Sequence, residues 1–408
     1  MSNMRSLREV ASIVRGISFP KGAKSTEPRP GDVACLRTTN VQKQVDWEDL
    51  WFVPAEHVRR DEQYVRLGDI LISTANSYEL VGKVALVSSK PRTATLGAFI
   101  ALIRPRDGIN SKFLYHQLAW GKTQSRIRET ASTTTNISNV STTKLAELDL
   151  RIPALDEQDR VVAEIEKQFS RLDEALVGLK RTHTKLDRYR ASVLAAACNG
   201  SLVGIDASRW PRRTLGEVAT TIRNGYSGKP DAQEGTRIFR ISAVRRLKLD
   251  SSDVRYLSGP ISQYKENRVE PGDVLFTRYN GTRNLVGVCA VVPSSIPPTI
   301  HPDKLIRVRV PDEILAPNML AVLASAGTGR AHMEARIRTT AGQSGISGSD
   351  LKTLPLAIPP RDVQEAILLE LARRLSVVDQ MNVEITNGLS KVTRLQNSIL
   401  TEAFGRAD

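Results

Sequence analysis

The sequence predicts an α+β fold in which two similar mixed α/β domains are joined by a long antiparallel two-helix coiled coil. Three observations predict this fold: an internal pseudo-two-fold repeat with an offset near 205 residues, short strand-like runs in both copies, and two long heptad patterns. The chain has 408 residues, and a domain typically holds about 100–200 residues, so two such domains fit the length.

The repeat consists of short segments that return in the same order in the second half of the chain. A duplicated sequence predicts two copies of one structural unit, so the repeat decides the architecture. The matching pairs are 7–11 with 215–219, 36–41 with 239–244, 67–73 with 271–277, 80–82 with 285–287, 136–138 with 345–347, and 150–153 with 356–359.

Charge divides each copy into a large basic segment and a neutral one. Residues 1–152 have a net charge of +7 (22 basic, 15 acidic), and residues 206–358 have +8 (22 basic, 14 acidic). Residues 153–205 are neutral (8 of each sign), and residues 359–408 carry −1 (6 basic, 7 acidic). The two basic segments are therefore predicted to bind a polyanion, the alternative being a basic surface that only favours solubility.

The basic segments have the patterns of short strands and helices. Residues 69–73 and 84–87 have the length and side-chain branching of strands. The turn pairs Gly68-Asp69 and Gly272-Asp273 stand just before predicted strands. Helices are predicted near 113–120 and 317–324, followed by polar loops.

The neutral segments carry apolar residues at heptad spacing, which predicts helices that pair along a seam. Asp156 and Asp362 are the predicted N-caps. The predicted seam residues are Ile165, Phe169, Leu172, Leu176, Leu179, Leu186, Val193, Leu371, Leu375, Val378, Ile385, Leu389, Val392 and Ile399. Four polar residues at seam positions, His183, Arg190, Asn382 and Gln396, are expected to set register and orientation.

Neither helix can bury such a seam alone, so the simplest partner for each is the other. A helix from 156 to 197 would extend about 60 Å at about 1.5 Å per residue. The stretch 198–213 is too short to bring the chain back along that length, so antiparallel pairing is expected.

Motifs for catalysis are not found in the sequence. It contains no GxxxxGK[ST] loop, no GxGxxG after a strand, no GxSxG and no zinc-type spacing of Cys or His. A nuclease site could be sought at Asp312 and Asp350, but the first copy does not keep that pattern. We therefore expect a non-catalytic binding protein with no bound metal.

The sequence also has no stretch of about 18 apolar residues that would span a membrane. The charged residues near the start do not fit a signal peptide, so a cytoplasmic location is expected. Aromatic residues make up only 5% of the chain, fewer than proteins that bind single-stranded nucleic acid by stacking use. Binding to a membrane surface would need a basic amphipathic helix, and the predicted helices are neutral. Double-stranded DNA is therefore the favoured polyanion. Each of the two basic segments, called a head below, is expected to read one half of a two-part site.

The pattern resembles the specificity (S) subunits of type I restriction-modification systems over the whole chain. The residues that carry the resemblance are 150–158 (LRIPALDEQ), 165–169 (IEKQF), Leu172-Asp173 and the repeated Gly-Asp-Ile/Val-Leu. The second copy departs from the pattern, because Asp362-Val363-Gln364 lacks the Glu of the Asp-Glu-Gln triplet.

The resemblance implies that 1–152 and 206–358 are target-recognition domains, while 153–205 and 359–408 are the central and distal conserved helices. Such subunits read a bipartite, asymmetric DNA site and bind two methyltransferase (M) subunits and restriction (R) subunits. S-adenosylmethionine, ATP and Mg²⁺ are used by those partners, not by this chain. Alternatives are a related system with a fused methyltransferase-nuclease partner, a coiled-coil protein adaptor with basic heads, and an enzyme with an unrecognised nuclease site.

DNA-contacting residues are expected in loops rich in Arg, Lys and amide side chains, since Arg pairs with guanine and Asn or Gln with adenine. The candidates are Lys21, Lys24, Arg37, Asn40, Asn76, Thr134 and Asn136 in the first copy, and Arg223, Tyr226, Lys229, Arg240, Arg278, Asn280, Arg283 and Gln343 in the second.

Overall fold

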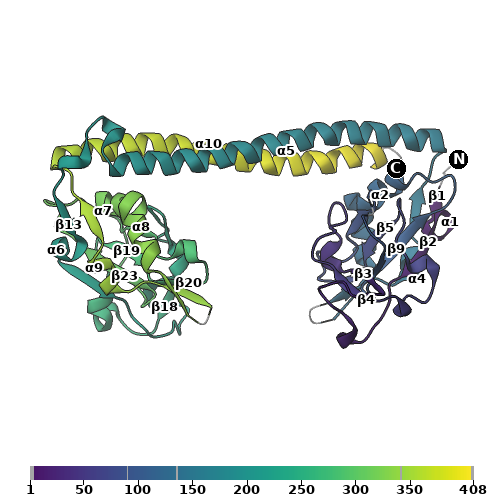
Figure 1. Cartoon of the computed structure of the whole chain (residues 1–408), viewed down its shortest axis with the longest axis horizontal. Coiled ribbons are helices and arrows are strands. Elements are labelled where there is room, and N and C mark those ends of the chain that lie inside the picture. Colours follow the sequence, from purple (N-terminus) through teal and green to yellow (C-terminus); the bar gives the residue numbers. More distant parts are fainter. Residues whose placement is uncertain (1–3, 90, 135–136, 341, 406–408) are drawn as a thin grey trace. The chain divides into compact units, whose positions relative to one another are not determined.

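The computed structural model of the protein describes residues 4–89, 91–134, 137–340 and 342–405 (Figure 1). The chain divides into two compact units. Unit 1 comprises Met1–Leu179 and Asn387–Asp408, and unit 2 comprises Lys180–Thr386. Each unit contains a globular mixed α/β part and a section of each of two long helices, α5 (Leu155–Cys198) and α10 (Arg361–Gly405).

The globular part of unit 1 has a four-stranded antiparallel sheet at its centre. Its order is β2 (Ala11–Arg15), β9 (Ile100–Pro105), β5 (Ile70–Ser73), β7 (Val84–Leu86). A mixed sheet of β4 (Trp51–Pro54), β3 (Asp32–Leu36) and β8 (Ala94–Leu96) shares a core with it. A smaller sheet has the order β10 (Ser132–Thr133), β11 (Ser138–Asn139), β6 (Ala75–Asn76). A two-stranded sheet pairs β1 (Met4–Ser6) with β12 (Asp149–Arg151). The helices are α1 (Leu7–Val10), α2 (Ser111–Ala119), α3 (Gly121–Glu129) and α4 (Thr142–Ala146).

Unit 2 repeats these strand orders. Its central sheet is β14 (Thr221–Asn224), β23 (Leu305–Arg309), β19 (Val274–Thr277), β21 (Cys289–Val291). The mixed sheet has the order β18 (Val254–Leu257), β15 (Thr236–Phe239), β22 (Thr299–Ile300). A three-stranded sheet has the order β20 (Tyr279–Asn280), β25 (Gln343–Gly345), β24 (Arg338–Thr340). Two-stranded sheets pair β13 (Arg212–Thr214) with β26 (Pro355–Ala357), and β16 (Val244–Arg245) with β17 (Lys248–Leu249). The helices are α6 (Leu215–Val218), α7 (Pro317–Ser325), α8 (Gly327–Arg336) and α9 (Gly348–Lys352).

The shared topology confirms the sequence repeat and corrects one matched segment. Ser138 pairs with Asn76 in unit 1, and Ser344 pairs with Asn280 in unit 2, so Ser138 corresponds to Ser344. Residues 139–141 therefore match 345–347, three positions later than predicted. In the corrected match, Ser141 and Ser347 are equivalent, and each is the N-cap residue of a short helix. Short polar loops align poorly by sequence because few residue types form them.

The repeated Gly-Asp pair places a buried aspartate against an arginine of the central sheet. Gly68 and Gly272 have φ of 85° and 86°, a conformation that favours glycine. The next residue in each unit, Asp69 or Asp273, is 1% exposed. Asp69 accepts hydrogen bonds from Arg104 Nε (2.8 Å) and Nη2 (2.7 Å). Asp273 accepts the same two bonds from Arg309, at 2.5 and 3.1 Å.

A buried glutamine joins each globular part to its long helix. Gln158 is 1% exposed, accepts a hydrogen bond from the Asn110 amide (2.8 Å) and donates to the Pro153 carbonyl (2.9 Å). Gln364, equally buried, accepts from the Ala316 amide (2.8 Å) and donates to the Pro359 carbonyl (2.9 Å). This explains why the second copy keeps Gln while losing the preceding Glu.

The N-cap prediction is wrong for both long helices. Helix α5 begins at Leu155 and α10 begins at Arg361, so Asp156 and Asp362 each lie in the first turn. An acidic residue there still interacts favourably with the amide-rich helix end. The sequence could not separate the two positions because Asp is common at both.

The predicted seam residues are buried or half-buried along both helices. In unit 1, Leu179 of α5 lies against Gly388 of α10. In unit 2, Arg190 of α5 donates a hydrogen bond to Asp379 of α10 at 2.7 Å. His183, one of the four polar seam positions, is instead exposed and lies 3.4 Å from Asp187 on the same helix.

The Asp-Arg pairs give a prediction about stability. Asp69→Ala would leave Arg104 without its carboxylate partner, and breaking a buried pair in this way costs about 3–5 kcal/mol. We expect the free energy of unfolding in urea to fall by that amount. Asp273→Ala should cost less in unit 2, because Arg309 is partly exposed and keeps its ion pair with Glu270 at 2.9 Å. The exposed Asp61→Ala serves as control. A loss below about 1 kcal/mol for both buried variants would contradict the assignment.

Candidate nucleic-acid interface

In unit 1, the three-stranded sheet β10-β11-β6 brings together candidates that are far apart in the sequence. Asn76 lies on β6, and exposed Thr134 follows β10. Thr133 and Ser138 face each other across the hairpin, with their hydroxyls 3.0 Å apart. Asn136 lies outside the described residues.

In unit 2, the matching sheet carries longer and more basic side chains. Asn280 lies on β20 opposite Ser344, and exposed Gln343 starts β25. Thr339 and Ser344 repeat the hydroxyl contact at 2.9 Å. The sheet also presents Arg338, whose side chain is 79% exposed, where unit 1 has Ser132. Arg338 is not among the predicted contacts, because the match between the two hairpins depends on strand pairing that the sequence alone does not give.

Other candidates on this side of unit 2 are engaged in local contacts. Arg278 stacks over the Tyr279 ring at 4.6 Å and donates to the Asp303 carbonyl. Arg283 donates to the carbonyls of Glu334 (3.1 Å) and Ile337 (3.3 Å), at the end of α8. The Asn280 side chain accepts a hydrogen bond from the Thr282 amide, so it also holds a turn.

A second group of candidates in unit 1 surrounds Trp51. Lys24 lies 3.7 Å above the ring centroid, and Arg37 lies 4.8 Å from it. Arg37 also pairs with Asp49. Lys21 is exposed in the short helix just before Lys24. Arg37, which lies by the Trp51 ring and pairs with the exposed Asp49, can exchange this carboxylate for a DNA phosphate at a small cost in free energy.

Asn40 does not reach the surface. It is 1% exposed, its Oδ1 accepts from the Arg37 amide (2.8 Å), and its Nδ2 donates to the Glu48 carbonyl (3.2 Å). The matching residue in unit 2, Ala243, is also buried. We therefore assign Asn40 to holding its loop, and the prediction of a direct DNA contact there is wrong. Arg240, the counterpart of Arg37, is exposed and lies 3.5 Å from Asp253.

The remaining unit 2 candidates lie at the end of β14 and just after it. Arg223 pairs with Glu266, and Tyr226 packs edge-on against Tyr264 with ring centroids 5.1 Å apart. Lys229 is exposed in the following loop.

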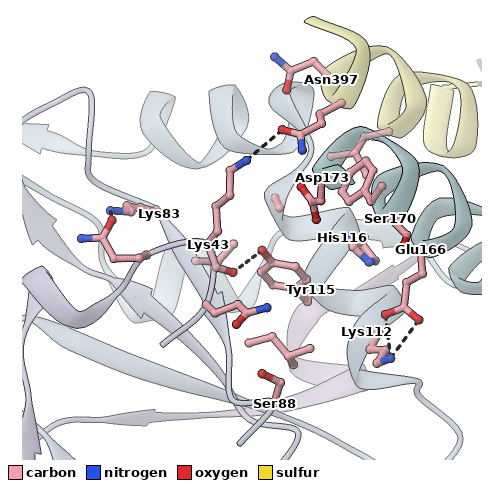
Figure 2. Close-up of a pocket in the computed structure, with 18 of the residues that line it drawn as sticks. Lys43, Lys83, Ser88, Lys112, Tyr115, His116, Glu166, Ser170, Asp173 and Asn397 are labelled. Atoms are coloured by element: carbon pink, nitrogen blue, oxygen red, sulfur yellow. Dashed lines mark hydrogen bonds and ion pairs between the residues drawn. The ribbon is translucent and has the colours of Figure 1, made fainter. Parts of the chain in front are cut away.

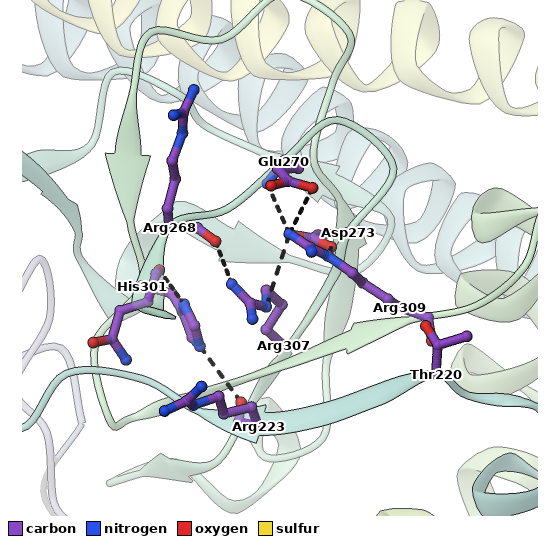
Figure 3. Close-up of polar contacts among 9 residues, drawn as sticks. Thr220, Arg223, Arg268, Glu270, Asp273, His301, Arg307 and Arg309 are labelled. Carbon is purple, nitrogen blue, oxygen red and sulfur yellow. Dashed lines mark hydrogen bonds and ion pairs between the residues drawn. The ribbon is translucent and has the colours of Figure 1, made fainter. Parts of the chain in front are cut away.

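Behind this strand end lies His301, which is fully buried. Its Nδ1 lies 2.7 Å from the Asn267 carbonyl oxygen, and its Nε2 lies 3.4 Å from that of Arg223 (Figure 3). Burial lowers the pKa of His301 to about 4, so the imidazole is neutral at pH 7.

A groove of about 1030 Å³ lies within unit 1, between the globular part and its helix sections (Figure 2). Lysines and acids line it together, including a Lys112–Glu166 ion pair of 2.7 Å. Lys43 donates to Gln396 of α10 (3.0 Å), and its carbonyl accepts from Tyr115 of α2 (2.8 Å). These contacts anchor the loop that follows Arg37 and Asn40. The mixed charges do not favour a polyanion.

The acids considered for a nuclease are engaged in the fold. Asp350 accepts a hydrogen bond from the Ser347 amide in a capping box, and Asp312 pairs with Arg361 at 2.9 Å. Within the described ranges, no cluster of three His, Cys, Asp or Glu residues could hold a metal ion. Burial raises the pKa of each thiol, Cys35, Cys198 and Cys289, to about 12. Among the described helices, none has both the length and the apolar character to span a bilayer.

This arrangement is shared with known proteins. The family model for the type I restriction modification DNA specificity domain matches residues 2–181. The specificity subunit of the type I restriction enzyme EcoKI from Escherichia coli (strain K12) is 30% identical over 405 residues, covering 97% of this chain and 86% of the relative. The chain belongs to the family of type I restriction enzyme specificity subunits.

Further relatives agree with this assignment. The StySPI specificity subunit from Salmonella potsdam is 26% identical over 415 residues, covering 97% of this chain and 86% of its own. A chain from a solved structure on the assembly and conformational transition of the type I R-M system matches with a TM-score of 0.71 at 18% identity, covering 98% of this chain and 97% of that one. The HsdS subunit from Thermoanaerobacter tengcongensis matches with a TM-score of 0.50 at 19% identity, covering 98% and 96%. The mixed α/β fold and the specificity-subunit role, rather than a catalytic one, are thus confirmed.

The buried histidine predicts a pH dependence of stability. Because the pKa of His301 is lowered in the folded chain, the unfolded chain binds more protons between pH 6.5 and 4, and the free energy of unfolding falls as the pH decreases through that window. Between pH 7 and pH 5 this histidine should contribute a loss of about 2 kcal/mol. His301→Leu should abolish that part of the dependence in urea unfolding, whereas the exposed-site variant His183→Leu should not. An unchanged pH slope in His301→Leu would contradict it.

Proposed function

We propose that this specificity subunit reads a bipartite, asymmetric site in double-stranded DNA with two target-recognition domains, residues 1–152 and 206–358. The observation that carries the proposal is one topology that appears twice with different side chains at matching surface positions. Where unit 1 has Ser132 on its hairpin sheet, unit 2 has Arg338. Two frames of the same kind with unlike polar surfaces fit two unlike half-sites.

Base contacts are assigned to the exposed candidates of the two hairpin sheets, such as Thr134 and Gln343. Phosphate contacts are assigned to the basic residues around Trp51 and at the end of β14. This division follows chemistry, since amides and hydroxyls discriminate base edges while cations position the protein on the backbone. The Asn76 and Asn280 side chains occupy the same strand position in both frames and are the natural pair to compare.

The helical segments 153–205 and 359–408 are proposed to form an antiparallel coiled-coil spacer. The support is that the paired positions run in opposite directions, 179 with 388 and 190 with 379. Two methyltransferase subunits would bind these neutral helices, and restriction subunits would join them. S-adenosylmethionine, ATP and Mg²⁺ would be used by those subunits, in the cytoplasm, where the DNA lies.

A test of the proposal is to express the chain with its neighbouring methyltransferase subunit and to map adenine methylation in host DNA by long-read sequencing. We expect a split motif with two unlike halves and a methylated adenine in each half. A purified complex that produces no new motif would contradict the proposal and favour a protein adaptor. Methylation and cleavage by one partner would instead identify the fused-partner system.

The two hairpin sheets give a prediction at the level of single residues. Thr134→Ala should relax the first half-site only, and Gln343→Ala the second only, because each removes a side chain of one head. Loss of a base contact costs about 1–3 kcal/mol, so discrimination at one position should fall roughly tenfold. Competition binding with half-site variants measures it, and each variant is the control for the other. Equal relaxation of both halves by either variant would count against independent heads.

A further inference from the structure

The two units differ inside the interface between their central and mixed sheets. Strand register gives the matching positions: Val14 pairs with Leu102 in unit 1, and Arg223 pairs with Arg307 in unit 2. In unit 1, the backbone amide of Ile17, two residues after β2, donates to the Leu96 carbonyl (2.7 Å). In unit 2, the amide of Tyr226, two residues after β14, donates to the His301 carbonyl (2.9 Å), so His301 matches Leu96. Three apolar residues of unit 1 are therefore replaced by an inter-sheet cluster in unit 2, which consists of Arg223, His301 and Arg307.

Two residues of the inter-sheet cluster, His301 and Arg307, are buried where unit 1 is apolar. Leu96, Leu102 and Val14 belong to one hydrophobic core in unit 1 and are 0%, 0% and 7% exposed. His301 is 0% exposed and Arg307 is 5% exposed, while the Arg223 side chain is exposed. Unit 1 has Leu96 and Leu102 at the positions of His301 and Arg307, so the shared fold accepts leucine at both buried positions.

The cluster binds backbone carbonyls of the neighbouring loop (Figure 3). A neutral imidazole has one N–H, and the shorter contact assigns it to Nδ1, which donates to the Asn267 carbonyl. Arg307 donates to the Arg268 carbonyl, and its Nε lies 3.9 Å from Asp273 without a hydrogen bond in the described part of the chain. Asp273 is already engaged by Arg309.

Stability does not account for this cluster. Burying a guanidinium with an unsatisfied Nε has a free-energy cost, and replacing buried ionic groups by apolar ones of similar volume is often neutral or stabilising. Unit 1 shows that the apolar solution exists in this frame. The polar version therefore serves something that the leucines do not supply.

The segment that the cluster holds carries predicted DNA contacts. The short helix Ile261–Asn267 ends at the two bound carbonyls, and it supplies Glu266 to Arg223 and Tyr264 to Tyr226. Arg268, directly after it, is exposed. The His301 backbone amide also donates to the Asn267 carbonyl (3.1 Å), so the two side chains add to a backbone bond in restraining the partners that orient Arg223 and Tyr226.

We propose that His301 and Arg307 are positioning residues for the second half-site, which hold the 261–268 segment so that Arg223, Tyr226 and Arg268 meet the DNA in one geometry. This inference rests on the proposed function. It makes the two heads unlike in their interior as well as in their surface loops.

The test uses the full chain in complex with its methyltransferase subunit. Arg307→Leu and His301→Leu install the residues found in unit 1, His301→Asn keeps a side-chain N–H near Nδ1, and Leu102→Met is the matched control in unit 1. DNA binding is measured against libraries randomised in one half-site at a time, together with the melting temperature of each variant at pH 7.

We expect both leucine variants to keep or raise the melting temperature and to lose roughly tenfold in discrimination at the second half-site, with the first half-site unchanged. His301→Asn should restore most of that discrimination, and Leu102→Met should alter neither half. Undiminished second-half discrimination in both leucine variants would overturn the inference, as would failure of these variants to fold, since the cluster would then be structural. If the wild-type complex itself showed no bipartite preference, the proposed function would fail instead.

Discussion

A long amphipathic helix cannot bury its apolar stripe by itself, and this constraint organises the whole chain. Helices α5 and α10 each have such a stripe, and in both units a section of one packs on a section of the other. The globular parts are attached to these helices by buried glutamines, Gln158 and Gln364, rather than by free linkers. The orientation of each head on its own helix is therefore set by hydrogen bonds that water cannot replace without exposing the joint.

The two copies keep the contacts that hold each globular part to its sheet and helix, and they differ in their surface loops and in the inter-sheet cluster. The Asp-Arg pairs of the central sheet and the glutamine joints are present in both units. The hairpin sheets keep their Thr–Ser hydroxyl contact, yet one presents Ser132 and the other Arg338. A rigid frame with variable loops is the arrangement expected of a protein that positions binding residues on a scaffold.

Much of this architecture could be predicted from the sequence, because it follows from periodicity and duplication. The heptad seam, the strands around residues 70 and 274 and the helix-sheet alternation are all set by patterns that extend over many residues. The family could be recognised from the residues around 150–158. His183 was predicted at the seam, but its side chain is exposed and contacts Asp187 on the same helix.

The predictions failed where a single contact decides the outcome. Asn40 has the residue type of a base reader but is buried by bonds to backbone groups that no pattern reveals. The inter-sheet cluster needs the strand register of both copies before Arg307 can be matched to Leu102. The same holds for the DNA contacts, since loop side chains of one type form turns in some places and bind ligands in others.

The central claim is that the chain is a duplicated reader whose heads act separately on their own half-sites. It is tested most directly by replacing residues 206–358 with a second copy of residues 1–152 and mapping adenine methylation in cells that also carry the methyltransferase subunit. The account predicts a motif made of two identical half-sites, both equal to the first half of the wild-type motif. An unchanged asymmetric motif, or a folded complex that methylates no defined site, would contradict it.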